Sequence, residues 1–580
     1  MTHEYTVLHG GLVITLDGAA PTDAASRSAG VPDAAGRRVT AIAFARDRII
    51  AVGSDVDVLA LAGADSRVID LGGRVVLPGF RDPHAHPIGE GVDAAKPLIG
   101  GENDLRAGLR VLSDAASRLP ADAWLLARYD QTGWRGGRHP TRDDLDRAIP
   151  DRPVLLAHVS GHAVAANSLA LAFAGVGAAT EDLPGRRAVE RDEHGDPTGI
   201  VTGTDAWDLF VEAFPAPSHR ELIAAIARAA GRLVADGVVA TADADLGSDG
   251  TGMQVAIAAY VAAANSGRLP LPVALMPGLV RLGPADVDPP TPDELAAAIP
   301  ARLRDRLPMR AAKLKADGAM TTRTAWLRED YADAPGWRGL PVGEPGALAE
   351  RIRRAHLAGW RTCTHAIGDA AVDAVLDALE AADREALAAG SRMSSAAAGG
   401  GSPSVASRGH RIEHAMLLDD AAITRIATLG AVASMQPEFV AWAGDTYRAR
   451  LGPERASRMN RYRSLLDAGV PIAFGSDRPV VGGRPLDGIA AAVRHAGPSG
   501  IRLSDDEAIS PAEALHAWTA GAAFAMGDDA EAGRLAVGSR ADLVVLSGDP
   551  TAAPVRGHRG SAPQVLATVV GGRTVHGEIG

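Results

Sequence analysis

The sequence predicts an α/β protein in which a TIM-like (β/α)8 barrel is joined to a small sheet domain built from both chain ends. Between about residues 78 and 529, eight short apolar runs alternate with Ala-rich stretches of helical character. Residues 1–77 and 530–580 instead carry short β-type segments separated by Gly and other turn residues. The 580 residues, 46% of them hydrophobic, can bury a large core, which excludes a globally disordered chain.

The two chain ends are expected to form one domain, made of residues 1–77 plus 530–580. Tyr5–Leu16 is apolar with turn residues at its centre, and Val39–Val52 is typical of a hairpin that turns at Arg46-Asp47. Near the other terminus, residues 540–546 and 565–570 are short apolar runs of the same kind. Segments from opposite ends of the chain can therefore complete one sheet.

The central domain, residues 78–529, contains the predicted barrel strands: Arg74–Phe80, Val238–Ala242, Leu271–Met276, Ala311–Leu314, Arg361–Thr364, Arg411–Ile412, Ala431–Met435 and Val470–Phe474. The predicted helices between them include His219–Asp236, Gly346–Ala358, Ala370–Ala389 and Asp419–Leu429. Residues from about 89 to 202 interrupt the alternation after the first strand, which predicts an inserted subdomain. Residues 388–408 are low in complexity and are predicted to be a disordered excursion.

Charge and cysteine content exclude several classes of protein. The formal net charge of −12 argues against a surface for nucleic acid, because phosphate binding needs clustered Lys and Arg. The single cysteine, Cys363, cannot form an intramolecular disulfide, which excludes a secreted disulfide scaffold. The first ten residues lack a secretory signal, and no apolar run reaches the ~18 residues of a membrane span. We therefore expect a cytoplasmic protein without a membrane partner.

Metal-ligand residue types follow the ends of several predicted strands. His84 and His86 come after the first apolar run, and alternate side chains of an extended chain share a face, so both can point at one ion. His365, His414 and Asp477 close three further runs. Alone, a His-x-His pair is often a loop feature and a strand-end Asp often caps a helix. Five such residues at one barrel mouth predict a metal site.

Lysine is almost absent from this chain, since only Lys96, Lys313 and Lys315 occur among its 59 basic residues. The period of two places Lys313, Lys315 and Asp317 on one face of a strand. An ammonium group beside a metal would repel it, but a lysine that has reacted with carbon dioxide becomes a carbamate anion, which can bridge two metals. The structural alternative is a salt bridge to Asp317, because unpaired buried charges are costly.

Several motifs together resemble the amidohydrolase superfamily, specifically its amidohydrolase family 3, or YtcJ-like, branch. These motifs are VLPGFRDPHAH, SGHAVAANSLAL, KLKADGAMTTRTAWL, THAIGDAAVDAVLDALE, RIEHA, MQPEF, FGSDRPV and GRLAVGSRADLVVL. They occur in the family's order and cover nearly the whole chain. The resemblance implies a TIM-like barrel, a composite β-sandwich domain from both termini, and a binuclear site that usually holds zinc.

The resemblance also implies the ligands of two zinc ions, with carbon dioxide bound as a lysine carbamate. The implied ligands are His84, His86, Lys313, His365, His414 and Asp477. From the residues alone, either Lys313 or Lys315 could carry the carbamate, and only the resemblance favours Lys313. Arg478 and Lys315 stand where the family usually has a small and an apolar residue, and we expect them to add positive charge near the pocket.

The implied activity is hydrolysis of a C–N bond other than a peptide bond, by attack of a metal-bound hydroxide on a small-molecule amide. An N-substituted formamide or a related acyl amide is the expected substrate, because the best-characterised activity of the branch is N-substituted formamide deformylase. Asp477 is expected to carry the proton from water to the departing nitrogen, and His162 to hydrogen-bond the substrate oxygen as a second catalytic residue. Asp317, Arg323 and Trp442 are further substrate-binding candidates, with Tyr129 and Trp134 as additional apolar wall residues.

Other interpretations stay open at this point. Asp317 and Arg323 can equally form a structural ion pair, and His162 can be a structural histidine. Within enzymes, a deaminase or an ester hydrolase can use the same site. From another class, the chain can be a regulatory or binding protein with a vestigial barrel, although a complete ligand set argues against lost function. A homodimer is one option for the oligomeric state.

Overall fold

The computed structural model describes residues 5–17, 39–100, 104–120, 122–131, 134–135, 137–159, 163–183, 187–203, 206–211, 213–214, 216–247, 252–344, 346–388, 409–552 and 563–579. The predicted site residue His162 and almost all of the predicted excursion at 388–408 lie outside the described residues.

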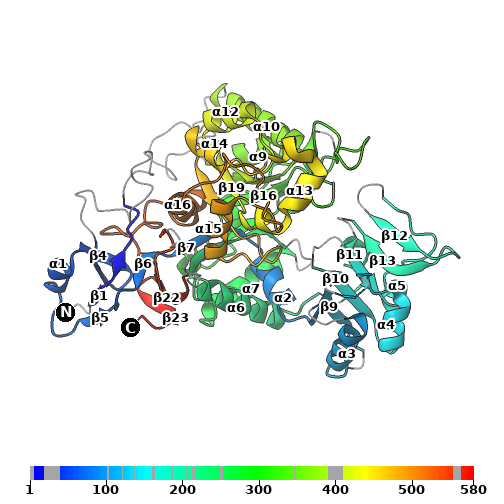
Figure 1. The fold of residues 1–580 in the computed structure, drawn as a ribbon, viewed down its shortest axis with the longest axis horizontal. Helices are drawn as coiled ribbons and strands as arrows, with labels where there is room; N and C mark the ends of the chain where they lie inside the picture. The colour runs from blue at the N-terminus through cyan, green and yellow to red at the C-terminus, as the bar shows by residue number, and fades with distance from the viewer. Residues whose placement is uncertain are drawn as a thin grey trace.

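Eight parallel strands in chain order form the centre of the described structure (Figure 1). They are β7 (Phe80–Ala85), β14 (Val238–Leu246), β15 (Val273–Pro277), β16 (Ala311–Lys315), β17 (Arg361–Ala366), β18 (Arg411–His414), β19 (Val432–Met435) and β20 (Ile472–Phe474). They pair as one sheet in the order β15-β14-β7 and a second in the order β16-β17-β18-β19-β20, with every neighbouring pair parallel. Parallel strands of this kind need covered faces, and their side chains are almost all buried.

In the described residues the parallel strands form two separate sheets and not one closed ladder. The predicted α/β arrangement of parallel strands is therefore present, but a closed barrel is not. Backbone hydrogen bonds nevertheless cross both gaps. Between β15 and the segment before β16, the amide of Val273 donates to the carbonyl of Arg306 (2.8 Å). Between β7 and the loop after β20, the amide of Asp477 donates to the carbonyl of His84 (2.7 Å).

Helices surround these strands. They are α2 (Pro87–Asp93), α6 (His219–Ala235), α7 (Met253–Asn265), α8 (Pro292–Ala296), α9 (Ala347–Leu357), α10 (Asp369–Ala388), α12 (Asp420–Leu429), α13 (Glu438–Ala456), α14 (Tyr462–Asp467), α15 (Pro485–Arg494), α16 (Pro511–Trp518) and α17 (Ala520–Met526). Helix α6 shows why they form. Ser218 and Glu221 make a capping box at its start, and apolar residues spaced three and four apart, from Leu222 to Leu233, are buried.

The first predicted strand, Arg74–Phe80, is wrong as a barrel strand. The chain changes partners in its middle: β6 (Val75–Pro78) pairs antiparallel with β21 (Leu543–Leu546), whereas β7 begins at Phe80. At this point the amide of Gly79 donates to the backbone carbonyl of Asp542, and the amide of Phe80 donates to the backbone carbonyl of Gly237. From Val75 to Phe80 every residue is buried and none is charged, because both sheets bury this segment, so hydrophobicity alone carries no signal for the change. As a consequence, His84 lies within the strand and not after it.

Both chain ends contribute to the sheets on one side of the molecule (Figure 1). One sheet contains β1 (Tyr5–His9), β3 (Ala41–Ala45), β4 (Arg48–Gly53) and β5 (Arg67–Asp70), next to helix α1 (Asp55–Leu59). The other joins β2 (Leu12–Val13) and β6 to β21, β22 (Val565–Val570) and β23 (Arg573–Gly577). One hydrophobic cluster, with Phe44 from the first sheet and Val545 from the second, lies between them.

A separate six-stranded sheet lies on the opposite side of the parallel strands (Figure 1). Its elements are β8 (Leu98–Ile99), α3 (Leu105–Ala116), β9 (Leu125–Tyr129), α4 (Arg142–Ala148), β10 (Val154–His158), β11 (Ala163–Ala166), α5 (Ser168–Phe173), β12 (Ala188–Arg191) and β13 (Pro197–Thr202). It has hydrophobic clusters of its own. Across the described residues, no helix combines the length and the apolar character needed to cross a membrane.

Candidate metal centre

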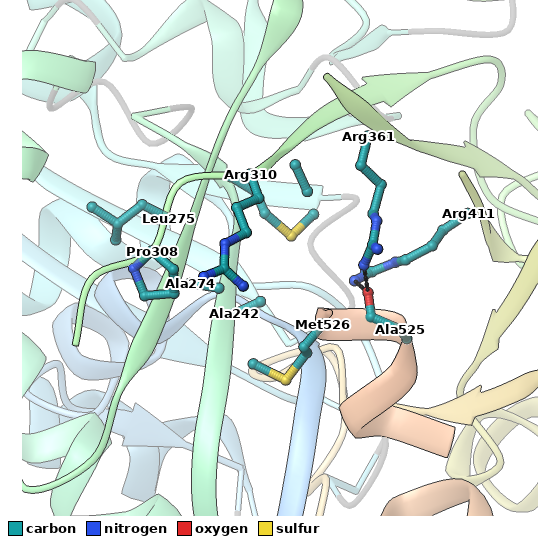
Figure 2. A pocket seen from close by; sticks show the side chains of 11 residues that line it. Ala242, Ala274, Leu275, Pro308, Arg310, Arg361, Arg411, Ala525 and Met526 are labelled. Carbon is teal, nitrogen blue, oxygen red and sulfur yellow. Dashed lines mark hydrogen bonds between the residues drawn. The ribbon is translucent and has the colours of Figure 1, made fainter. Parts of the chain in front are cut away.

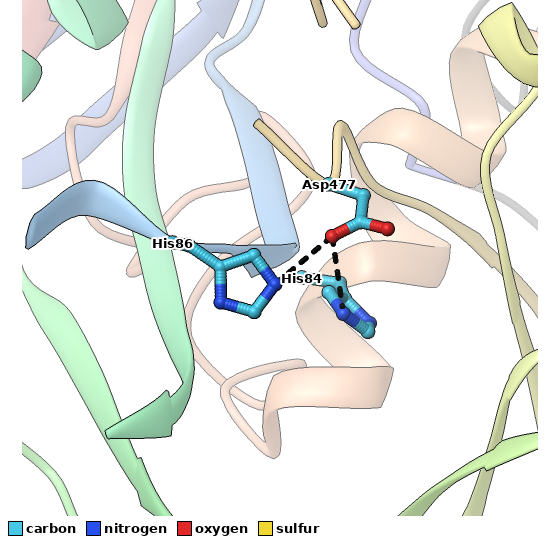
Figure 3. A group of neighbouring side chains, drawn as sticks. All are labelled: His84, His86 and Asp477. Atoms are coloured by element: carbon cyan, nitrogen blue, oxygen red, sulfur yellow. Dashed lines mark ion pairs between the residues drawn. The ribbon is translucent and has the colours of Figure 1, made fainter. Parts of the chain in front are cut away.

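His84, His86 and Asp477 meet at the carboxyl ends of β7 and β20 (Figure 3). The Oδ1 atom of Asp477 lies 3.0 Å from Nε2 of His86 and 3.5 Å from Nε2 of His84. One ligand atom from each residue falls within 4.8 Å of the others. Burial lowers the pKa of His86, but the hydrogen bond and charge of Asp477 outweigh this effect and raise it overall. The carboxylate is ionised, because the imidazoles around it hold its pKa below the ordinary value despite burial.

Lys313 reaches the same cluster from β16. Its Nζ lies 3.0 Å from Nε2 of His84, and its side chain is almost fully buried. Burial lowers the pKa of Lys313, which favours the neutral amine. Lys315 differs: about half of its side chain is exposed, and its Nζ pairs with Asp245 at 3.0 Å. Of the two lysines that the sequence left open, Lys313 is therefore the one at the cluster.

His365 and His414 complete the group from β17 and β18. Their ring centres are 4.4 Å apart, and the ring of His414 is 5.0 Å from that of His84. Burial lowers the pKa of His414 to about 3 and that of His365 well below its ordinary range. Both imidazoles are thus neutral and keep a lone pair for a metal. The structure brings together all six side chains predicted as ligands.

Partners outside the cluster fix the orientation of three imidazoles. Nδ1 of His84 contacts the carboxylate of Glu413, and Nδ1 of His414 lies 2.6 Å from Oε1 of Gln436. Nε2 of His365 lies 3.0 Å from the carbonyl oxygen of Gly318. Each acceptor assigns the proton to the ring nitrogen that faces it, so the other nitrogen has its lone pair free. Ligating histidines in metal sites are held in this way, so this donor set fits divalent metal ions.

Glu413 was not predicted as a functional residue, because neighbouring side chains of a strand point to opposite faces and His414 was expected to face the metal site. His414 has a φ of +73° and Ala415 a φ of +44°, so the extended backbone ends at this point and the alternation does not continue across it. Glu413 therefore reaches His84 while His414 reaches His365. The Arg411-x-Glu413 spacing was a usable signal, because a buried carboxylate needs a cation, and Arg411 Nε donates to Glu413 at 2.6 Å.

Replacing Glu413 with Gln is expected to weaken zinc affinity by about 10- to 100-fold, the usual effect of losing a carboxylate that orients a ligating histidine. Titration of metal-free protein against a competing chelator measures this. The matched control is Glu507→Gln, which removes the charge of a buried carboxylate that pairs with Arg461 and Ser464 and with none of the proposed ligands. Equal zinc affinity for Glu413→Gln and wild type would contradict the role of Glu413.

The predicted substrate-binding residues have different surroundings. Asp317 is buried, and its carboxylate accepts backbone N–H groups from Trp326 (2.9 Å), Ile367 (3.0 Å) and Gly368 (2.8 Å). Its carboxylate therefore ties the loop after β16 to the loop after β17. The predicted alternatives of an ion pair from Asp317 to a lysine or to Arg323 are wrong, since Arg323 pairs with Asp333 at 2.9 Å.

Trp442 lies on α13 and is 41% exposed. Its ring centre is 6.1 Å from that of Phe439, whose ring stacks on His414 at 6.0 Å. A line of aromatic rings thus leads from the cluster toward the surface. Tyr129 and Trp134, expected beside Trp442, are instead buried in the core of the insertion, because their rings complete the hydrophobic cluster of its sheet.

The expectation for Arg478 changes with the structure, whereas the burial of Cys363 agrees with a residue that takes no part in catalysis. Arg478 adds no net charge to the cluster, because its guanidinium turns away and pairs with Asp236 at 2.5 Å and Glu90 at 3.6 Å. Cys363 is fully buried, and burial raises its pKa to about 12, so it is not a nucleophile.

A narrow pocket at the other, amino-terminal end of the strands is a separate feature (Figure 2). Figure 2 shows Arg361 and Arg411 converging on the carbonyl oxygen of Ala525, at 2.7 Å and 3.3 Å. Because these arginines join the starts of β17 and β18 to α17, they stabilise this end of the strands. Chemistry in parallel α/β structures is placed at the carboxyl ends, where the His–Asp–Lys cluster lies.

Eight parallel strands with buried imidazole and carboxylate groups at their carboxyl ends define the fold of a metal-dependent hydrolase. A solved structure of this type, an uncharacterized metal-dependent hydrolase from Pyrococcus furiosus, superposes with a TM-score of 0.71 at 26% identity, covering 94% of this chain and all of that one. The model of the family described as "Amidohydrolase family" matches residues 67–576. This chain therefore belongs to the amidohydrolase family.

Two relatives are similar to the chain over most of their length. The putative amidohydrolase YtcJ of Bacillus subtilis (strain 168) is 32% identical, covering 88% of this chain and 90% of the relative. The N-substituted formamide deformylase of Arthrobacter pascens is 27% identical, covering 83% of this chain and 85% of the relative. The resemblance to the YtcJ-like branch that the motifs indicated is confirmed.

Proposed function

We propose that this protein is a binuclear, metal-dependent hydrolase that cleaves the C–N bond of a small amide, an N-substituted formamide or a related acyl amide. One observation carries the proposal. Four imidazoles, the Asp477 carboxylate and the buried Lys313 amine converge at one end of the parallel strands. Similarity to a formamide deformylase supports the substrate class. The continuous strand order and the hydrogen bonds across both gaps support a TIM-like barrel as the working scaffold.

His84, His86, Lys313, His365, His414 and Asp477 would hold two divalent cations, zinc by preference. When bound, such cations polarise a carbonyl group and lower the pKa of a water molecule toward ~7. The neutral amine of Lys313 can add to carbon dioxide, forming an N–C bond and releasing one proton, which gives a carbamate anion. This change replaces a potential positive charge in the cluster with a negative one and so removes the conflict between lysine and metal.

Asp477 is the residue that moves the proton in the proposed reaction. Its Oδ1 accepts a proton from the attacking water as the C–O bond forms, and returns it to the amide nitrogen as the C–N bond breaks. The products are an amine and a carboxylic acid, formate in the case of a formamide. His86, 3.0 Å from this oxygen, keeps the carboxylate oriented toward the cluster.

The aromatic line from His414 through Phe439 to Trp442 would receive the substituent on nitrogen. Phe439 is mostly buried and Trp442 is 41% exposed. An aryl or alkyl substituent that binds along these rings would therefore be transferred from water to an apolar surface. Burial of apolar surface would contribute affinity that a charged substituent lacks.

An assay of zinc-reconstituted protein against N-substituted formamides, acyl amides, amino-purine or amino-pyrimidine substrates and aryl esters tests the proposal. We expect release of amine from the formamides or acyl amides, with benzyl substituents preferred over methyl. Metal-free protein prepared with a chelator is the control and is expected to be inactive. Turnover confined to ring amino groups or to esters would reject the amide assignment. Fewer than one bound zinc per chain, with no activity restored by zinc, would favour a regulatory protein.

A further inference from the structure

Arg478 is almost completely buried next to the proposed metal ligand Asp477, and its side chain pairs with groups outside the metal cluster. Its guanidinium pairs with Asp236 (2.5 Å) and Glu90 (3.6 Å), and its Nε donates to the carbonyl of Gly483 (3.3 Å). Glu90 lies on α2, which begins directly after His86, and Asp236 caps the end of α6, which leads into β14. One side chain thus joins three segments around the first ligand strand.

The backbone of Arg478 lies in the gap between β7 and β20, where the two strands have no ladder. Its carbonyl oxygen accepts the amide of His86 (2.9 Å), and the amide of Asp477 donates to the carbonyl of His84 (2.7 Å). Two backbone hydrogen bonds therefore connect three ligands of the cluster. Figure 3 shows the result, with the Asp477 carboxylate directed at both His84 and His86.

Neighbouring residues show how tightly this gap is built. The buried carboxylate of Asp82 on β7 accepts the amide (3.0 Å) and hydroxyl (2.5 Å) of Ser476, and Ser476 Oγ accepts the amide of Arg478 (3.1 Å). Gly483 covers the Arg478 side chain with a φ of +67°, and a Cβ there would stand only 2.6 Å from Cγ of Arg478. A larger residue at position 483 would displace the guanidinium.

We propose that Arg478 is a positioning residue: its buried pairing with Asp236 and Glu90 holds the loop after β20 against β7 and so sets the distance between Asp477 and the two histidines. The inference rests on the proposed function, because it assumes that these three residues bind metal together. The geometry of a metal site must be held closely, so a loop that drifts by a fraction of an ångström loses affinity. Arg478 would act on metal binding through Asp477, without contacting metal or substrate.

Arg478→Met tests this inference by zinc affinity, measured on metal-free full-length protein by competition with a chelator. We expect a loss of about 10- to 100-fold, as for other residues that orient ligands. Arg478→Lys is expected to recover part of the loss, because an ammonium can pair with one carboxylate but cannot reproduce the planar fork. Asp236→Asn, which keeps the shape and removes the partner's charge, is expected to shift the affinity in the same direction and serves if Arg478→Met does not fold.

Arg463→Met is the matched control. Arg463 is largely buried and pairs with Glu513 at 2.6 Å between α14 and α16, away from the cluster, so its loss is expected to lower the Tm but leave zinc affinity unchanged. A purely structural Arg478 would behave in the same way, with a lower Tm and wild-type zinc affinity, and that result would overturn the inference alone. Wild-type protein that binds no zinc would overturn the proposed function and the inference with it.

Discussion

Lys313→Ala is expected to reduce turnover by at least ~10²-fold, and short carboxylic acids such as formate or acetate are expected to restore part of it. The amine lies 3.0 Å from Nε2 of His84 in a buried site, so the variant leaves a space where the proposed carbamate would stand. Loss of one ligand also displaces the others, and displacements of about 1 Å already cost ~10²-fold in rate. A free carboxylate can enter the space and supply the two missing oxygens. Steady-state kcat with and without added acid measures both effects.

Lys315→Ala is the control for this experiment. Lys315 lies on the same strand, but it pairs with Asp245 and half of its side chain is exposed. We expect its kcat to stay within a few-fold of wild type, with no response to added acid. Unchanged turnover in Lys313→Ala, or acid rescue of Lys315→Ala in its place, would contradict the bridging role of Lys313.

Asp477→Asn is expected to lower kcat by about 10²- to 10⁴-fold even when zinc is saturating, the range for loss of a general base. The amide has the shape of the carboxylate but cannot accept and return a proton. Zinc affinity should fall as well, because the amide brings no negative charge to His84 and His86. Measuring kcat across a zinc titration separates the two roles.

Asp245→Asn is the control, because Asp245 is a buried carboxylate at the same mouth that forms its ion pair with Lys315, at 3.0 Å, and is not one of the proposed ligands. Its φ of +65° suits asparagine as well as aspartate. We expect a kcat near that of wild type. If saturating zinc restores full kcat to Asp477→Asn, then Asp477 is a ligand only and another residue carries the proton.

Strand ends with metal-ligand residues were predictable from the sequence because a barrel presents such residues on one side. His84, His365, His414 and Asp477 all lie where short apolar runs end, and the structure brings them together. The scarcity of lysine also pointed to Lys313, but the choice between Lys313 and Lys315 required three dimensions. Both lysines have the same place in the strand period, and only burial and partners distinguish them.

Features that depend on backbone turns or on distant partners could not be predicted. The change of sheet at Gly79 leaves no mark in an apolar run, and the positive φ of His414 cannot be read from its residue type. Arg478 was expected to add positive charge to the pocket. Its pairing with Glu90 and Asp236 could not be foreseen, because these residues lie 388 and 242 positions away in the sequence. Such pairings depend on how the helices pack against the strands.

Anomalous X-ray scattering at the zinc edge, from crystals of zinc-loaded wild-type protein, is the most direct test of the central claim. The account predicts two peaks about 3.5 to 4 Å apart, both in contact with the group formed by His84, His86, Lys313, His365, His414 and Asp477. Additional density on Nζ of Lys313 would be expected between the peaks. A map without a peak among these side chains, at full zinc loading, would contradict the account.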